Sequence, residues 1–329
     1  MIIHVPNRSI ICPDDPVVGL STMSGWYKIE KLKVDAHGRA IEASRTVVAD
    51  WFPNIITDQG LNRPGSAADW LAACQVGSGS AAPAASNTSL ASFIAGSTTI
   101  QAQSSGAQAS APFFGWRRNT YRFAAGVGTG NLSEVGIGWA ATGATLFSRA
   151  LILDAGLNPT TITKLADEVL DVTYEIRNHP PTSDATGNIT ITGSGVHAFV
   201  TRAAVVTSGA GSWAINNVAG DQFGIAASTS GTVYNGAIGA VTATPSGSIA
   251  TGLTPARSAY SNNSYQRLGT VTAGLNGGNV ADGIRSILLN YGGSSGGAGV
   301  FQTEFTPPIP KTASNQLTLN VTHTWARRP

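Results

Sequence analysis

The chain has 329 residues, enough for two ordinary domains and for a hydrophobic core that needs neither a disulfide nor a metal. Charged residues make up 12% of it, about half the share usual in soluble domains, and 20 basic against 18 acidic side chains leave a net charge of +2. This composition disfavours a helical bundle, a membrane protein and a nucleic-acid binder, because it provides neither long apolar stretches nor a strong basic field.

The first 50 residues are expected to form an N-terminal arm and a β-hairpin. Residues 1–8 show no basic region followed by an apolar run, so we expect no Sec-type signal peptide. Residues 27–34 alternate apolar side chains with lysines, and Asp and Gly turn residues connect them to a second apolar stretch over 40–51. This pattern predicts the hairpin.

Helix signals are scarce. Residues 66–74 predict a short helix, capped by Ser66 after a Pro-Gly pair, and residues 88–94 predict a second one. The two cysteines, Cys12 and Cys74, lack the spacing of metal ligands. So few thiols in a chain of this length favour reduced, buried side chains over a disulfide.

Alternating apolar and polar residues predict most of the strands. Two segments, 169–177 and 316–325, alternate cleanly, so each is expected to turn one face toward a core. The residues expected on these faces are Leu170, Val172, Tyr174, Ile176, Leu317, Leu319, Val321 and Trp325. Further strands are expected at 121–127, 133–140, 145–153, 188–193, 196–206, 223–228, 237–243, 268–275, 284–292 and 299–305.

Two segments carry no charged residue, 77–111 and 222–256, and both are rich in Ala, Ser, Thr and Gly. One interpretation is a flexible linker. The other is an ordered, extended loop packed on a neighbouring subunit, where charge is depleted and small residues let backbones approach. Scattered apolar residues in the first segment favour order, and the sequence leaves both interpretations open.

A weak internal repeat divides the rest of the chain. The pattern Ile-x-Lys-x-Ala-x-x-x-Leu begins at Ile162 and again at Ile309, and a Gly-Asn pair recurs at nearly the same shift. Each copy ends in a long alternating strand. We therefore expect an all-β fold of two tandem, duplicated, jelly-roll-like β-sandwich domains over 51–180 and 181–329, with few short helices.

No histidine arrangement predicts a metal or catalytic site. The five histidines are isolated in the sequence, with His37 and His179 in predicted turns and His323 on the outward face of the last strand. We therefore expect no metal and no other cofactor.

The remaining patterns do not predict catalysis either. Gly136 and Gly138 fit a dinucleotide fingerprint only in spacing, since a turn and a strand follow them instead of a helix. Adjacent acids such as Asp167 and Glu168 point to opposite faces of an extended chain, so they cannot converge on one bond. The chain is expected not to be an enzyme, and the sequence assigns no catalytic, cofactor-binding or receptor-binding residue.

Residues 116–122 mix two aromatic side chains with three arginines. Such a segment could hold a glycan or a nucleic acid. Without a wider basic patch, the favoured interpretation is structural: arginines stacked on aromatic rings at a strand edge, or a salt bridge between subunits.

Several segments together resemble a family of tail-associated virion proteins of tailed bacteriophages, often called tail fibre or tail proteins. The similarity covers most of 50–177 and about 300–327, and the chain lacks the repetitive shaft of a typical fibre. The segments that carry it are 52–57 (FPNIIT), 60–61 (GL), 74–79 (CQVGSG), 130–136 (GNLSEVG), 146–152 (LFSRALI), 168–177, 307–311 (PPIPK) and 325–327 (WAR).

The resemblance implies a place in a virion, and we expect a non-enzymatic structural subunit of the tail, near the baseplate, tip or fibre attachment. It would be assembled in the bacterial cytoplasm as a symmetric oligomer, through arms and sheet edges that pair with other copies and other virion proteins. Deleting residues 1–20 is expected to impair assembly while both β-domains stay folded. The alternatives are a receptor- or glycan-binding tail module, a head decoration or fibre protein and, last, a depolymerase.

Overall fold

Strands make up most of the chain, so the expected all-β class is confirmed. The computed structural model describes residues 8–11, 17–66, 69–207, 213–216, 218, 223, 231–292 and 299–328. Within these residues there is one α-helix, α1 (Asp58–Ser66), and one 3-10 turn, η1 (Glu42–Ser44).

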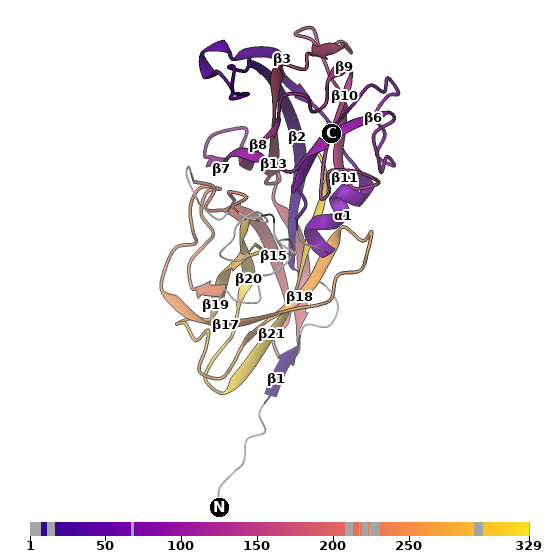
Figure 1. Cartoon of the computed structure of the whole chain (residues 1–329). Helices are drawn as coiled ribbons and strands as arrows, with labels where there is room; N and C mark the ends of the chain where they lie inside the picture. The colour runs from indigo at the N-terminus through magenta and orange to yellow at the C-terminus, as the bar shows by residue number, and fades with distance from the viewer. Residues whose placement is uncertain are drawn as a thin grey trace, which may run out of the picture.

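A large sheet of fourteen described strands runs along the molecule (Figure 1). In spatial order its main path is β14 (Ala185–Ile191), β15 (Gly195–Ala204), β20 (Val300–Ile309), β19 (Ile284–Asn290), β16 (Gly231–Tyr234), β17 (Ile249–Arg257), β18 (Gln266–Ala273), β21 (Asn315–Arg327), β2 (Val17–Lys33), β13 (Glu168–His179), β8 (Phe114–Phe123) and β7 (Ile100–Gln108). Two more strands join this path from the side: β1 (Arg8–Ile11) at β21 and β3 (Thr46–Pro53) at β2.

β2 is a 17-residue strand that pairs with both halves of the chain. It lies antiparallel to β13, where Thr22 is opposite His179, and parallel to β21, where Val17 is opposite Val321. Most of its residues alternate between buried and half-buried, which is the pattern of a strand with one face on a core. β2 and β3 are antiparallel neighbours joined through a turn at Asp35, which confirms the expected hairpin.

A smaller sheet packs over one half of the large sheet. Its order is β4 (Ile55–Ile56), β11 (Leu146–Leu151), β10 (Glu134–Gly138), β5 (Ala73–Gly77) and β6 (Phe93–Ser97), and β9 (Gly130–Leu132) pairs separately with β12 (Ile162–Lys164). The hydroxyls of Tyr27 on β2 and Ser148 on β11 are hydrogen-bonded at 2.7 Å, and the ring of Tyr27 contacts that of Tyr174. This half is a sandwich of two sheets.

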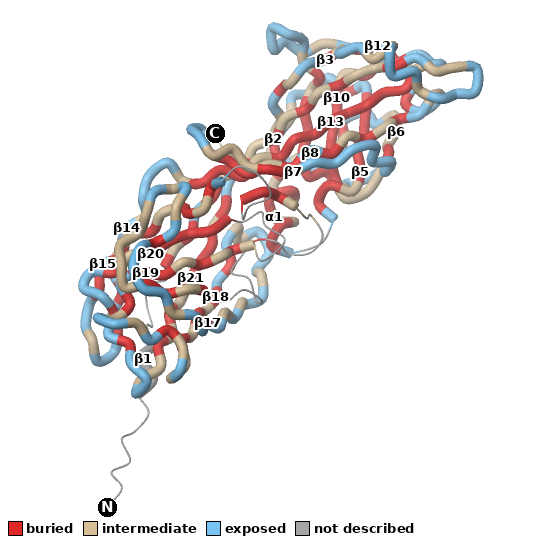
Figure 2. The backbone as a smooth tube through the Cα atoms, turned by 90° about the vertical axis from the view of Figure 1, so that its left-hand side faces the viewer, coloured by how far each residue is buried: buried red, intermediate tan, exposed pale blue. Residues whose placement is uncertain are grey.

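In the other half, the strands from β14 to β21 curl around a second part of the core (Figure 1). Figure 2 shows buried residues along both halves and α1 at their junction. There, Trp325 Nε1 donates to the Leu61 carbonyl at 2.7 Å, and Arg327 forms an ion pair with Asp58. α1 therefore connects the end of β21 to the first half.

β13 and β21 present the faces that their alternation predicts. All eight residues expected toward the core on these strands are at most 2% exposed. The opposite face of β13 is covered as well, since Asp171 and Glu175 are buried under arginine side chains. Alternation therefore identifies the core face but does not show that both faces of β13 are buried.

The helix predicted over 66–74 is wrong. Ser66 ends α1 instead of capping a helix, and β5 follows, paired with β10 on one side and β6 on the other. α1 begins earlier because the Thr57 hydroxyl accepts a hydrogen bond from the Gly60 N–H at 2.9 Å and caps the first turn. A Cβ at Gly60 would lie 2.0 Å from the Phe147 carbonyl oxygen, so glycine lets α1 lie against β11.

The helix predicted over 88–94 is also wrong, because β6 begins at Phe93 and the N–H groups just before it donate to Glu134 instead of to helix carbonyls. The strand predicted over 237–243 is wrong as well, since these residues form a loop between β16 and β17. The strand predicted over 223–228 lies outside the described residues, apart from Phe223. The other expected strands correspond to β8, β10, β11, β14, β15, β18, β19 and β20.

The first charge-free segment, 77–111, is ordered and contains β6 and β7. Of the second, residues 231–256 contain β16, the loop after it and most of β17, and most of the remainder lies outside the described residues. The expected N-terminal arm is described only at 8–11 and from residue 17 onward. Because Val17 to Leu20 already pair with β21, deleting residues 1–20 would also shorten this ladder.

Replacing either core leucine by alanine, Leu170→Ala or Leu317→Ala, is expected to lower the free energy of unfolding by about 2–5 kcal/mol, because each change removes buried methyl groups and leaves a cavity. Urea denaturation measures the change. The matched controls Leu165→Ala and Leu268→Ala, at side chains 53% and 50% exposed, should change it little. Unaltered stability in both core variants would show that the faces are assigned the wrong way round.

Candidate functional site

The histidines do not come together. Within the residues that the structure describes, no group of three or more His, Cys, Asp or Glu side chains is placed to hold a metal ion. His37 lies in the exposed hairpin turn, as expected. The prediction for His179 is wrong: it is the last residue of β13, it is buried, and its Nε2 is 2.9 Å from the Ser24 hydroxyl.

The outward position predicted for His323 is also wrong. His323 is fully buried because it has the same parity along β21 as Leu319 and Val321, and residues two apart share a face. Its ring packs among Phe223, Tyr291, Phe301 and Trp325. Burial lowers the pKa of His323 to about 3, so the ring is neutral near pH 7.

The other patterns weighed for chemistry have structural roles. Cys74 is a free thiol whose pKa is raised by burial, which makes it a poor nucleophile, and Cys12 lies outside the described residues. Gly136 and Gly138 lie within β10, with no helix after them. Glu168 forms an ion pair with Lys31 at 3.0 Å at one end of β13.

Aromatic and charged side chains gather on the outer face of the sheet formed by β3, β2, β13 and β8. We call this surface the Trp–Arg face, and it consists of Trp26, Trp51, Trp116, Arg118, Glu175 and Arg177. The Arg118 guanidinium lies 5.2 Å from the ring centre of Trp51 and 4.8 Å from that of Trp116. Arg177 lies 5.3 Å from the ring centre of Trp26 and 4.5 Å from that of Phe114.

Glu175 connects the two arginines of this face. One of its carboxylate oxygens accepts from Arg118 Nε and the other from Arg177 Nε, and the side chain is 1% exposed. Cross-strand register brings the set together, because Glu175 lies opposite both Trp26 and Arg118. Sequence analysis identified only Trp116 and its arginines, since the strands that supply the other residues are distant in sequence.

The arginines on either side of Arg118 are also engaged. Arg117 points to the opposite face of β8 and donates to the Asn216 carbonyl at 2.7 Å. Arg122 forms a bidentate pair with the buried Asp171, at 2.8 and 2.7 Å. Arginines stacked on aromatic rings and paired with acids agree with the structural interpretation of residues 116–122.

A buried ion pair organises the first charge-free segment. Glu134 on β10 accepts hydrogen bonds from the N–H groups of Gly79, Ala91 and Ser92, at 2.6 to 3.0 Å, and pairs with Arg149 at 2.8 Å. Burial alone raises the pKa of Glu134, but the backbone donors and Arg149 outweigh burial and leave the pKa below its ordinary value. Arg149 also donates to the side-chain oxygen of Asn87 at 2.7 Å and to the Ala81 carbonyl at 2.9 Å. One carboxylate therefore holds both ends of the loop between β5 and β6.

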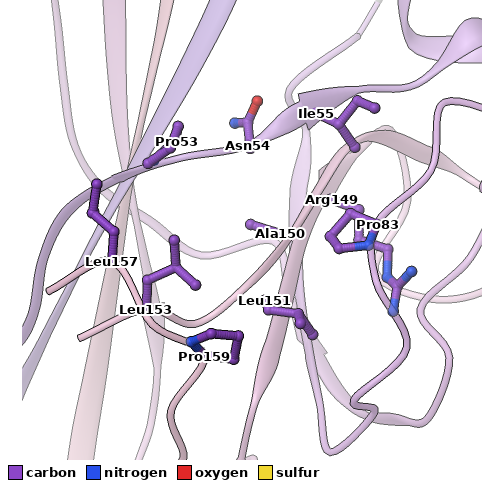
Figure 3. A pocket seen from close by; sticks show the side chains of 10 residues that line it. All are labelled: Pro53, Asn54, Ile55, Pro83, Arg149, Ala150, Leu151, Leu153, Leu157 and Pro159. Atoms are coloured by element: carbon purple, nitrogen blue, oxygen red, sulfur yellow. The ribbon is translucent and has the colours of Figure 1, made fainter.

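Figure 3 shows an apolar hollow of about 290 Å³ beside this ion pair, where β4 and β11 meet the loop before β12. Leu153, Leu157 and Pro159 form one wall, and Pro83 and Arg149 stand on the opposite side. Leu157 is 57% exposed. The hollow has no acid in its lining, and its arginine is already paired, so it provides apolar contact rather than acid–base chemistry.

β7 is an uncharged strand at one end of the large sheet. It pairs with β8, and among the described residues no strand pairs with its other side. Its sequence, IQAQSSGAQ, has no charged residue and no proline, and its first five residues are exposed. Trp116 lies across it, since a Cβ at Gly106 would be 2.9 Å from that ring. β7 therefore presents an open hydrogen-bonding edge next to the Trp–Arg face.

Comparisons with models of known protein families, with curated proteins and with solved structures find no match. Among the described residues, no helix is long and apolar enough to cross a membrane. The function is therefore inferred from the surfaces described above, of which the β7 edge and the Trp–Arg face are the candidates.

Replacing Glu134 by Gln is expected to lower the free energy of unfolding at pH 7 by about 3–5 kcal/mol, because the change leaves Arg149 buried without its ionic partner. Because the pKa of Glu134 is lowered by folding, its stabilisation is present above the ordinary value of about 4.3 and is lost as the pH falls through the lower folded value. Urea denaturation at pH 7 and at decreasing pH measures both effects.

The control for this experiment is Glu42→Gln, since the Glu42 side chain is 63% exposed and its ion pairs lie at the surface. It should change stability little at any pH. A Glu134→Gln variant as stable as the wild type, or a difference that persists unchanged in acid, would contradict the role given to this ion pair.

Proposed function

We propose that the chain is a non-enzymatic structural subunit of a bacteriophage tail that assembles through its sheet edges with other copies and with other virion proteins. The observation that carries this proposal is the open edge of β7. Soluble proteins usually protect such edges with charged residues, prolines or covering segments, because an unprotected edge pairs with other chains. β7 has neither charged residues nor proline, so a paired partner is its natural protection.

The other end of the large sheet has the same character. β14, with the sequence ATGNITI, is also free of charged residues and proline. Two uncharged end strands on one sheet suit a subunit that adds neighbours on both sides, as in a ring or a layered assembly. Because the sequence resembles tail-associated virion proteins, we propose that this assembly is part of a phage tail.

The place in the virion is tested on particles. Antibodies against the chain are expected to label the tail of purified phage particles that carry it, in immunogold electron microscopy. Label over the head would overturn the tail assignment in favour of a head decoration protein. Particles without any label would contradict a virion role.

We also propose that the halves of the chain, 51–180 and 181–329, are duplicated jelly-roll-like domains. Each half contains an antiparallel pair that ends in a long strand, β8 with β13 in the first and β18 with β21 in the second. Lys164 and Lys311, at matching positions of the sequence repeat, are both buried. These parallels favour duplication over two unrelated halves.

A second candidate function is a receptor- or glycan-binding module of the tail. The Trp–Arg face favours it, because it combines three half-buried tryptophans with two arginines on a rigid sheet. Tryptophan and arginine are enriched at binding hot spots. Both functions are compatible in one subunit, since the β7 edge and this face use different groups.

Charging the β7 edge, with Ala102→Lys and Ser104→Lys together, is expected to convert an oligomer to monomers without lowering the melting temperature, because lysines on an edge oppose pairing with another strand. Light scattering measures the mass. The matched control, Val196→Lys with Ala198→Lys, adds the same charge to exposed positions of β15, which lies between β14 and β20, with Ala198 opposite both Asn188 and Thr306. A monomeric wild type, or a β7 variant that still assembles, would argue against edge pairing.

A further inference from the structure

A second hollow, of about 300 Å³, opens beside the Trp–Arg face where the two halves meet. Its lining includes Trp26, Asn54, Arg177, His179 and Arg328, together with the Ser24 hydroxyl, and it includes no acidic side chain. This volume is at the lower end of the range for small-molecule sites, about 300–1,000 Å³, and suits one monosaccharide unit.

Two guanidinium groups supply the charge of this hollow. Arg328 forms no side-chain hydrogen bond or ion pair with any other residue that the structure describes; only its backbone N–H is bonded, to the Met23 carbonyl. Arg177 uses its Nε for Glu175, and no described residue accepts from its two terminal nitrogens. The Arg177 guanidinium stacks against the rings of Trp26 and Phe114, and these contacts fix its orientation.

The pKa of His179 reflects the positive charge around this hollow. Burial lowers the pKa of His179 to about 4, and the charges of Arg328 and Arg177 act in the same direction. The imidazole is therefore neutral near pH 7 and contributes no charge of its own, so the hollow depends on the two arginines to attract an anion.

The other lining groups are neutral and suited to a sugar. The Ser24 hydroxyl, which lies 2.9 Å from His179 Nε2, is a hydrogen-bonding group of the kind that recognises sugar hydroxyls, and Trp26 provides an aromatic ring at the wall. Beyond Arg328 lies a further hollow of about 450 Å³, lined in part by Leu20 and Thr22, which leaves room for the next unit of a chain.

We propose that this hollow binds the carboxylate-bearing sugar of an acidic glycan, with Arg328 and Arg177 on the carboxylate and Trp26 beside the sugar ring. A planar guanidinium matches a carboxylate in two parallel, charge-assisted hydrogen bonds, which are stronger than those it donates to the uncharged hydroxyls of a neutral sugar. The proposal rests on the second candidate function, receptor binding, and is independent of edge pairing through β7.

The test uses the full chain and two sugars that differ only in the carboxylate: methyl glucuronide and methyl glucoside. Binding is measured by NMR titration and by tryptophan fluorescence. Glucuronide is expected to bind at least tenfold more tightly than glucoside, and Arg328→Gln to remove at least this factor, as the loss of a charge-assisted pair implies. The control Arg39→Gln removes the same charge from the exposed hairpin turn and should leave binding unchanged.

Equal binding of both sugars, or a glucuronide affinity unaffected by Arg328→Gln, would overturn the proposal. So would tighter binding of inorganic phosphate or of an acidic peptide than of glucuronide, since either result would assign the hollow to a different anion. Light scattering separates this proposal from the first one: Arg328→Gln should still assemble, and the β7 double variant should still bind glucuronide.

Discussion

The pairing of β2 with β13 on one side and β21 on the other is the constraint on which the rest of the structure depends. At Thr22 and Met23 both neighbours are present, one antiparallel and one parallel, so these residues join the two halves into one sheet. A parallel pair cannot be closed by a tight turn, and here nearly the whole chain lies between its strands. The ladder at the start of β2 can therefore form only after β21 is available, which gives the fold many contacts between residues distant in sequence.

The structure shows where the few charged side chains of the chain lie, which the composition does not. Several of its few ionic side chains are buried and hold segments in place, as Glu134 and Arg149 do for the loop between β5 and β6, and as Asp171 and Glu175 do on β13. The charge left for the surface is correspondingly smaller. Strands such as β7 therefore meet solvent with neutral side chains, a surface that other protein chains cover at little desolvation cost.

Periodicity predicts the parts of this fold in which one face of a strand meets a core, as at Leu170 on β13 and Leu317 on β21. Periodicity fails where contacts between residues distant in sequence determine the local structure. α1 contains Gly60 and Pro64, which oppose a helix locally, yet the Thr57 cap and the close approach to Phe147 place a helix there. Residues 116–122 indicate only part of the Trp–Arg face, and the charge-free segment 77–111 does not show that β7 is an edge strand, since both features arise from strands brought together by register.

The place of the arginine-lined hollow follows from the same constraint on β2. β13 ends at His179 opposite Thr22, and the β21 pairing ends at Arg327 opposite Met23, so both neighbours of β2 stop at the same level. The residues at these ends, His179 on one side and Arg328 on the other, thereby reach the same hollow beside Ser24 and Trp26. β2 also changes neighbours here, since its ladder with β21 stops at Met23 and its ladder with β3 begins at Trp26, and the hollow lies between the two. The junction that joins the two halves thus also brings together Arg177 and Arg328, whose guanidinium groups have nitrogens left to donate to a ligand.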